Sequence, residues 1–144
     1  MTDPQHDAGI QVRREVLGDD HVDRAIATTT PFSEPFQDFI TRSAWGEVWA
    51  REELDRRTRS CITLALLAAL RCESEIPMHV RAALRNGVTP AEIAAVLMHT
   101  TVYAGIPAAK AAFTQAQETL ADDGVPEALP EGALSGDQAG SDIT

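Results

Sequence analysis

The sequence predicts an all-α fold built around one core. Apolar residues recur at helical spacing along most of the chain, and no run of alternating β-branched and polar residues is flanked by hairpin turn signals. Glycine and proline stand between the periodic segments, where helices end and begin. The 144 residues are enough for one core and too few for two ordinary domains. We expect helices over residues 9–17, 21–28, 34–50, 56–70, 75–85, 90–103 and 108–120.

The first three helices follow from turn and capping residues. Gly18 ends the first helix, and Asp19 or Asp20 can cap the second. Residues 1–8 are expected to form a flexible start. Ser33 precedes the third helix, whose apolar residues should form one continuous stripe. The stripe consists of Phe36, Phe39, Ile40, Trp45 and Trp49.

The fourth and fifth helices include the most apolar part of the chain. Asp55 can cap the fourth helix, which is apolar on nearly all sides from Cys61 to Leu70 and should lie at the centre of the fold. Ser74 can cap the fifth helix, and Pro77 then falls in its first turn, where the missing N–H costs little.

The last two helices are marked by a capping box and a break. The segment Thr89-Pro90-Ala91-Glu92 is a capping box with proline at the first helical position. Gly105 and Pro107 separate this helix from the final one. Residues 121–144 mix Gly, Pro, Ser and acids with few large apolar groups, so we expect a flexible acidic tail. The folded domain is therefore expected over residues 9–120.

The charge and hydropathy of the chain exclude several kinds of partner. The 12 Lys and Arg residues stand against 22 Asp and Glu residues, and the net charge of -10 would repel nucleic acid and anionic membranes. The longest apolar run is Cys61 to Leu70, far shorter than the roughly 20 residues that span a bilayer. The acidic start does not resemble a signal peptide, and two cysteines are few for a secreted scaffold. We expect a cytoplasmic protein with reduced cysteines.

His79 and Glu75 form the most suggestive pair of chemically active residues. Four residues apart on one helix, their side chains would share a face within contact range. The ordinary alternative is a solvated ion pair, which is common at this spacing. Cys72 lies nearby in sequence, but no second Cys or His completes a set of four zinc ligands, so no metal site is expected.

Glu47 is a second candidate acid. It stands between Trp45 and Trp49, and a carboxyl group flanked by indoles could be partly desolvated, which would raise its pKa toward that of a useful proton donor. The equally plausible alternative is that Glu47 points to water while the indoles pack. The remaining histidines, at positions 6, 21 and 99, are interpreted as structural or surface residues.

Five segments occur in an order and spacing that is highly specific. They are VRREVLGDDHVDRA, FQDFITRSAWGEVW, LDRRTRS, MHVRAALRNGVT and YAGIPAA. Through them the chain resembles the carboxymuconolactone decarboxylase family from Val12 to about Phe113. The wider superfamily includes the alkyl hydroperoxidase D proteins, whose Cys-x-x-Cys-x-x-x-His motif would place thiols at Cys72 and at position 75. Because position 75 is Glu75, the second thiol is absent and decarboxylation is favoured over dithiol chemistry.

The resemblance implies a fold, an assembly and a reaction. The fold would be an alkyl hydroperoxidase D-like bundle of about six helices, assembled as a homodimer or as a hexamer of three dimers. The reaction would be decarboxylation of 4-carboxymuconolactone, a lactone dicarboxylate, to 3-oxoadipate enol-lactone in protocatechuate catabolism. No cofactor is required, because the unsaturated lactone itself accepts the electrons that decarboxylation leaves behind.

The same resemblance guides the assignment of roles. His79, held by Glu75, would stabilise the enolate or deliver the proton, and Glu47 is the competing acid. Arg57 would clamp a substrate carboxylate. The apolar wall of the site would come from Trp45, Trp49 and Tyr103.

Several positions depart from the family pattern and keep alternatives open. Arg71 and Cys72 replace a Gly that is usually followed by Arg or His, Glu52 and Glu53 replace Pro-Gly, and Lys110 replaces an Asn. A decarboxylase acting on another keto acid in a biosynthetic pathway is one alternative. A thiol peroxidase or reductase that uses the Cys72 thiol is another, and an oligomeric structural protein that kept only the fold is a third.

Overall fold

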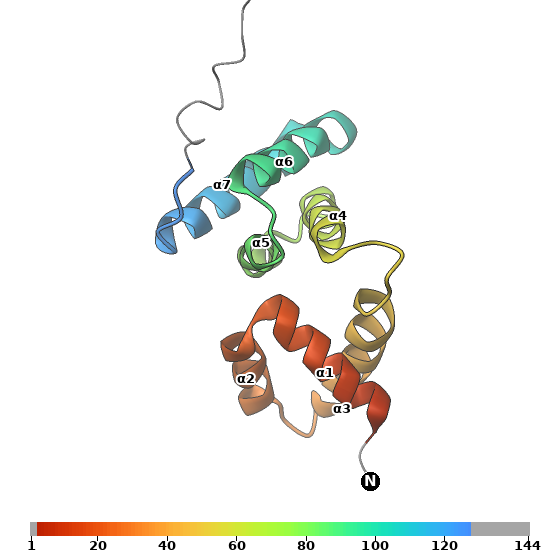
Figure 1. The fold of residues 1–144 in the computed structure, drawn as a ribbon. Coiled ribbons are helices and arrows are strands. Elements are labelled where there is room, and N and C mark those ends of the chain that lie inside the picture. Colours follow the sequence, from red (N-terminus) through yellow and green to blue (C-terminus); the bar gives the residue numbers. More distant parts are fainter. Residues whose placement is uncertain (1–2, 128–144) are drawn as a thin grey trace, which may run out of the picture.

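A computed structural model describes residues 3–127 and confirms the all-α prediction. No strand occurs among these residues, which form seven α-helices, one π-helix and one short 3-10 helix (Figure 1). In chain order they are α1 (Pro4–Leu17), α2 (Asp19–Thr28), α3 (Glu34–Ile40), η1 (Thr41–Trp49), α4 (Arg56–Ala69), η2 (Glu73–Glu75), α5 (Ile76–Arg85), α6 (Pro90–Ala104) and α7 (Ile106–Asp122). No helix in the described range is long and apolar enough to cross a membrane.

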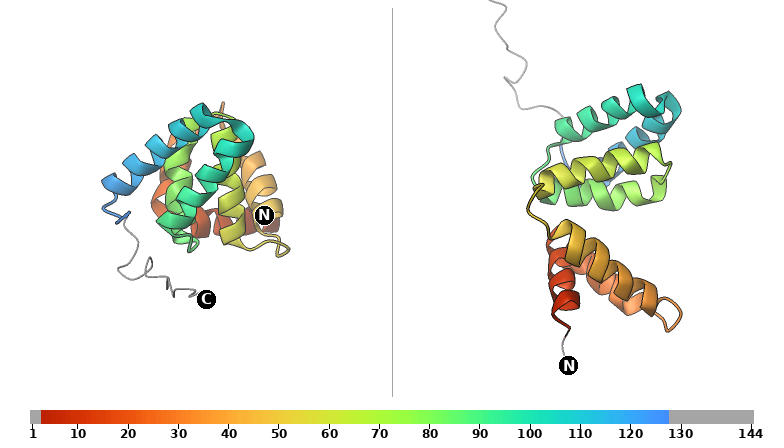
Figure 2. Two further views of the ribbon diagram at one scale, coloured as in Figure 1. Left: turned by 90° about the horizontal axis from the view of Figure 1, so that it is seen from above. Right: turned by 90° about the vertical axis from the view of Figure 1, so that its right-hand side faces the viewer.

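The helices form two lobes, which Figures 1 and 2 show one above the other. The N-terminal lobe consists of α1, α2, α3 and η1, and the C-terminal lobe consists of α4 to α7 with η2. Helices α1 and α5 pack against each other at the junction. Arg85 of α5 also donates a hydrogen bond from Nη1 to the Val16 carbonyl oxygen of α1, at 3.0 Å.

The C-terminal lobe has an aliphatic core. Two of its helices begin with the predicted N-caps. The Asp55 carboxylate accepts from the Thr58 amide at 2.7 Å at the start of α4, and Thr89 and Glu92 form the expected capping box at the start of α6. Small alanines on α7 let this helix approach its neighbours closely. The largest fully buried side chains of this core are those of Leu64, Ile76, Val80, Ile93 and Leu97.

The N-terminal lobe depends on a close approach between α1 and η1. Gly9 makes this contact possible, because a Cβ at this position would collide with the carbonyl oxygen of Thr41. Thr41 and Trp45 are buried on η1, and Trp49 is half-buried on the same helix. A π-helix has a wider turn than an α-helix, so residues four apart lie almost above one another and can face α1 together.

Helix α5 contributes to both cores. Its Ile76, Val80 and Ala83 side chains lie in the C-terminal core, whereas Ala82 is buried in the N-terminal core and Met78 packs against it. The helix that carries His79 is therefore fixed from two sides.

Three predicted boundaries need correction. The first helix begins at Pro4 rather than near residue 9, because the Asp3 carboxylate accepts from the Gln5 amide at 3.0 Å, so most of the start expected to be flexible is helical. The second helix is preceded by Gly18, and neither of the two aspartates expected to cap it does so. The fifth segment is divided into η2 and α5, and Ser74 makes no capping hydrogen bond.

Two apolar segments are only partly buried within one protomer. In the third segment, Phe36 and Phe39 of the predicted stripe are 61% and 65% exposed, whereas Trp45 is buried. The apolar run on α4 buries Leu64 and Ala68, but the opposite face of this helix is open to solvent. The exposed residues of that face are Ile62, Leu66 and Leu70.

The C-terminal boundary also lies later than expected. Helix α7 continues to Asp122, Asp123 accepts from Arg81 Nε at 2.7 Å, and Val125 packs against the C-terminal core. The remainder of the tail expected to be flexible, residues 128–144, lies outside the described residues.

Candidate active site

His79 lies at the junction of the two lobes. It projects from α5, is mostly buried, and its Nδ1 atom has no hydrogen-bond partner among residues 3–127. Burial, with a smaller contribution from the nearby His21 imidazole, lowers the pKa of His79 to about 4. The imidazole is therefore neutral at pH 7 and ready to donate or accept one hydrogen bond.

Glu75 does not hold His79 as expected. It belongs to the 3-10 helix before α5, its side chain is exposed, and no hydrogen bond or ion pair joins it to His79 in the described part of the chain. The spacing of four residues spans a helix boundary, so the i,i+4 geometry of a continuous α-helix does not apply. The charge of Glu75 acts instead on His21, whose pKa it raises against the stronger effect of burial.

His21 is a residue whose role the sequence did not reveal. Burial lowers its pKa, and the charges of Arg13 and Arg24 lower it further. Together with Met78 and Arg85 it lines a cavity of about 450 Å³ between α2 and α5. His21 and His79 are 58 positions apart in the chain, and only the packing of α2 near α5 brings them together.

Arg13 was also missed, although the sequence contained a signal. Val12, Val16 and Leu17 form the apolar face of α1, and Arg13 lies on this face with only 6% of its surface exposed. Its Nη1 atom donates to Gln37 Oε1 at 3.1 Å and to Thr41 Oγ1 at 3.4 Å. A charged residue inside an apolar stripe is rare enough to have been singled out.

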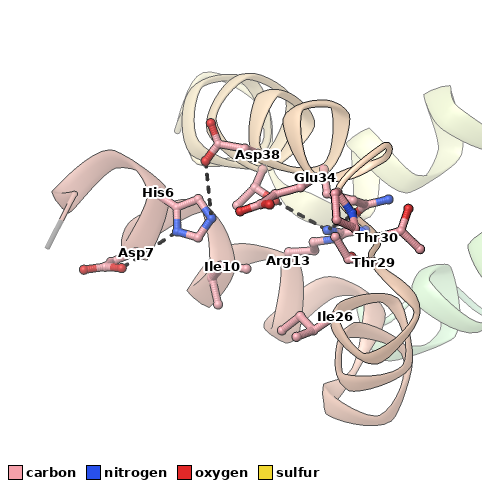
Figure 3. A pocket seen from close by; sticks show the side chains of 12 residues that line it. His6, Asp7, Ile10, Arg13, Ile26, Thr29, Thr30, Glu34 and Asp38 are labelled. Carbon is pink, nitrogen blue, oxygen red and sulfur yellow. Dashed lines mark hydrogen bonds and ion pairs between the residues drawn. The ribbon is translucent and has the colours of Figure 1, made fainter.

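Arg13 lines the largest cavity, which has a volume of about 750 Å³ and does not include His79. Figure 3 shows the surrounding side chains, with Ile10 of α1, Ile26 of α2, Thr29 just after α2, and Asp38 of α3. The accessible lining atoms are mainly apolar, although nine of the twelve lining residues are polar or charged and come from α1, α3, η1 and the segment after α2. The cavity is large enough for a small organic acid.

Arg57 is engaged elsewhere. Its guanidinium donates two hydrogen bonds to the carboxylate of Glu92 and one to the carbonyl oxygen of Gly87. These bonds tie the start of α4 to the start of α6, and the Arg57 pairing lowers the pKa of Glu92 to about 2. Within one protomer, Arg57 thus has a carboxylate partner before any substrate arrives.

Glu47 points away from the indoles. The rings of Trp45 and Trp49 stack on each other with centroids 5.2 Å apart, whereas the exposed Glu47 carboxylate accepts a hydrogen bond from Gln5 Nε2 at 3.1 Å. Of the two interpretations that the sequence left open, the geometry matches the one in which the carboxylate faces water.

Tyr103 lies on a different surface of the protomer. It is 79% exposed near the end of α6 and packs against His99, with ring centroids 4.9 Å apart. The two residues line a shallow cavity next to α4, on the far side of the C-terminal lobe from α1. Electrostatic effects thus link His79 to His21 and His21 to Glu75, whereas Glu47, Arg57 and Tyr103 make their contacts with other residues in the described protomer.

Comparisons with known proteins identify the family. The model of the carboxymuconolactone decarboxylase family matches residues 34–118. A 4-carboxymuconolactone decarboxylase from Acinetobacter baylyi is 47% identical over 126 residues, which are 87% of this chain and 94% of that protein. The chain belongs to the carboxymuconolactone decarboxylase family. The resemblance inferred from the five sequence segments is thereby confirmed.

Two further relatives extend the comparison. The nitrosuccinic acid decarboxylase npaB from Metarhizium robertsii is 43% identical over 116 residues, covering 81% of each chain. A 4-carboxymuconolactone decarboxylase from Pseudomonas putida is 54% identical over 43 residues, which are 30% of this chain and 90% of that sequence. The relatives in the carboxymuconolactone decarboxylase family therefore include named decarboxylases of two different acids.

Proposed function

We propose that this protein converts 4-carboxymuconolactone to 3-oxoadipate enol-lactone by cofactor-independent decarboxylation. The observation that carries the proposal is the 47% identity to a 4-carboxymuconolactone decarboxylase, which extends over nearly the whole of both chains. The neutral, buried imidazole of His79 supports it, since a group of this kind suits proton handling.

The substrate supplies the electron sink. When the ring carboxylate leaves as carbon dioxide, the electron pair of the broken C–C bond spreads through the ring double bond to the lactone carbonyl oxygen. The resulting furan-like enolate is then protonated on the ring carbon next to the carbonyl carbon, which gives the enol-lactone. The protein has to orient the substrate, desolvate the departing carboxylate, stabilise the enolate oxygen and supply one proton.

His79 is proposed to act on the enolate. Because its pKa is lowered to about 4, the His79 imidazole is neutral in the free enzyme. Its ring N–H donates a hydrogen bond to the enolate oxygen as negative charge develops there. A bound dianion next to His79 and His21 would raise the pKa of both imidazoles, so that His79 can take up a proton from solvent and then pass it to the ring carbon of the enolate. Glu47 remains the competing proton donor, and its exposed position makes it the weaker candidate.

A homo-oligomer is part of the proposal. Thirteen large apolar residues of the described protomer are exposed, seven of them on α3, α4 and α6 and the others on α2, η1, α7 and connecting segments. Apolar surface of this extent is unusual for a monomer and suits a dimer or a hexamer of three dimers. The most exposed of these residues are Phe32, Leu70, Val102, Tyr103 and Ile106. In such an assembly, Tyr103 would form part of the apolar wall of a site across a subunit contact, and light scattering that finds a monomer at micromolar concentration would contradict the assembly.

Nitrosuccinic acid is the second candidate substrate, because a relative 43% identical over 81% of the chain is named a nitrosuccinic acid decarboxylase. The two decarboxylations are chemically similar. In each, a carboxylate leaves from a carbon that is joined to an electron-withdrawing group, directly in nitrosuccinate and through the ring double bond in the lactone, and a second carboxylate remains on the product.

The test is a direct comparison of both substrates with the purified protein. We expect carbon dioxide release from 4-carboxymuconolactone at a kcat/KM at least about a hundredfold above that for nitrosuccinate. The reverse ratio would make nitrosuccinate decarboxylation the function. Peroxide consumption that is lost in Cys72→Ser, without decarboxylation of either acid, would favour the thiol enzyme instead.

A further inference from the structure

The buried guanidinium of Arg13 is a charge without a counter-charge. No carboxylate lies within 4.0 Å of it among residues 3–127, and its Nε atom has no hydrogen-bond partner there. Its Nη2 atom donates no hydrogen bond in the same range, whereas Nη1 is occupied by Gln37 and Thr41. Burying an unpaired cation costs several kcal/mol of folding free energy. An anionic ligand that binds beside the guanidinium would offset this cost.

The immediate neighbour of Arg13 shows the usual arrangement. Arg14 is less buried, yet it has two carboxylates, with Nη1 3.2 Å from Asp19 Oδ1 and Nη2 2.8 Å from Asp23 Oδ1. A buried charge gains more from a partner than a solvated one. Yet the more exposed Arg14 has carboxylate partners, whereas the buried Arg13 has none among residues 3–127. Burial alone lowers the pKa of Arg13.

We propose that Arg13 binds the carboxylate that the substrate retains, at the inner end of the cavity between α1, α2 and α3. The inference rests on the proposed function, because it takes the substrate to be a small dicarboxylate. Nη2 supplies the contact, and the apolar lining near Ile10 and Ile26 receives the carbon skeleton. Arg13 thus takes the role that the sequence suggested for Arg57, which is already bound to Glu92.

The acidic groups of the cavity do not offset this charge. Asp38 lies 2.8 Å from Arg42 Nε and 3.7 Å from His6 Nε2, and Asp7 lies 3.9 Å from His6 Nδ1 (Figure 3). These carboxylates are partly exposed and partnered, and Glu34 is exposed at the first turn of α3. Solvent and salt screen exposed charges strongly, whereas a desolvated guanidinium is screened little, so its attraction dominates at the inner end of the cavity.

The position of Arg13 also suits the reaction. Beside burial, the charge of Arg13 lowers the pKa of His21, and the His21 imidazole contributes to the lowered pKa of His79, so electrostatic effects link Arg13 to His79 through His21. Neither histidine lines the cavity of Arg13, so a dicarboxylate held there has to extend beyond the cavity lining to reach His79. Arg13 is thus a binding residue that orients the substrate, and the proton chemistry stays with the imidazoles.

The experiment compares Arg13→Gln and Arg13→Lys with the matched control Arg14→Gln. For decarboxylation, we expect Arg13→Gln to raise KM about tenfold to a hundredfold with a smaller change in kcat, and Arg13→Lys to recover part of the loss. Arg14→Gln should leave KM within about threefold of the wild type. Circular dichroism and the thermal midpoint establish that each variant is folded.

Succinate, a dicarboxylate that cannot be decarboxylated by this route, provides a second measurement that is independent of turnover. Calorimetric titration should show saturable binding to the wild type and to Arg14→Gln, and binding at least about tenfold weaker to Arg13→Gln, with Arg13→Lys in between. An unchanged KM in folded Arg13→Gln, or succinate affinity equal in all variants, would overturn the role of Arg13 and leave the proposed function standing. Succinate binding that depends on Arg13, without turnover of either acid, would instead contradict the proposed function alone.

Discussion

The two lobes differ in how they treat buried polar groups. In the C-terminal lobe the buried hydroxyls of Ser60, Thr100 and Thr119 are all hydrogen-bonded, and the core around them is aliphatic. Arg59 Nε of α4 lacks a partner in residues 3–127, but Arg59 is only partly buried and its Nη2 donates to the Arg51 carbonyl oxygen at 3.2 Å. In the N-terminal lobe the smaller core encloses Arg13, which has no carboxylate partner among the same residues, and it borders His79, whose Nδ1 is unsatisfied there. Unsatisfied groups of this kind are expected where a ligand completes the structure. The comparison indicates that the C-terminal lobe stabilises the fold and that the chemistry lies at its boundary with the N-terminal lobe.

Replacing His79 should produce the largest effect. We expect His79→Ala to lower kcat about a hundredfold to a thousandfold, because it removes the group that stabilises the enolate or protonates it. Steady-state kinetics at saturating substrate provide the measurement, with the thermal midpoint recorded in parallel.

His99→Ala is the matched control for this substitution. His99 packs on Tyr103 at the far side of the C-terminal lobe, so its loss should change kcat by less than about threefold. If the two histidine variants lose similar activity, the distinction between a stabilising lobe and a chemical boundary fails.

A core substitution in the C-terminal lobe should act on stability instead. Leu64 is fully buried among aliphatic side chains, and Leu64→Ala should lower the free energy of unfolding by about 2–5 kcal/mol. Urea unfolding measures the loss, and kcat of the folded fraction should stay within about threefold of the wild type. A large fall in kcat at low temperature, where the variant is folded, would show that this core also shapes the site.

The lowered pKa of His79 makes stability depend on pH in a defined direction. The unfolded chain binds a proton near pH 6.5 and the folded chain only near pH 4, so stability is full above pH 6.5 and falls as the pH drops toward 4. The loss attributable to this group is on the order of 3 kcal/mol. Urea unfolding of wild type and His79→Gln at several pH values tests it, since the variant should lose less stability across this window. Parallel pH dependence in both proteins would place the burial of His79 in doubt.

Glu47→Gln should have the smallest effect. Its carboxylate is exposed and bonded only to the flexible side chain of Gln5, so we expect kcat to change by less than about threefold. An inactive Glu47→Gln enzyme beside an active His79→Ala enzyme would transfer the role of proton donor to Glu47. The family assignment would be unaffected by that result.

Local signals predicted the fold well. The caps at Asp55 and Thr89 act over three residues, and the structure contains the hydrogen bonds that their sequences require. The break at Gly105 also falls between two helices as expected. The prediction was less accurate at Ser74, which was expected to cap the fifth helix. Ser74 lies instead within a short 3-10 helix, and α5 begins two residues later at Ile76.

The candidate site was only partly predictable, because its contacts are distant in sequence. Arg57 binds Glu92, 35 positions away, and the residues next to Arg57 in sequence do not predict this partner. His21 likewise gains its significance from α5, which packs near it only in the folded chain. Arg13 is different, since its place on the apolar face of α1 can be read from the spacing of Val12, Val16 and Leu17.

The shared helix α5 has a consequence for dynamics. Because Ile76 and Val80 belong to one core and Ala82 to the other, α5 cannot open locally without disrupting both. Its backbone amides should therefore exchange with deuterium only through global unfolding, more slowly than those of α2, which buries Val22 alone. His79 is thus carried by a helix that we expect to exchange among the most slowly in the described part of the chain.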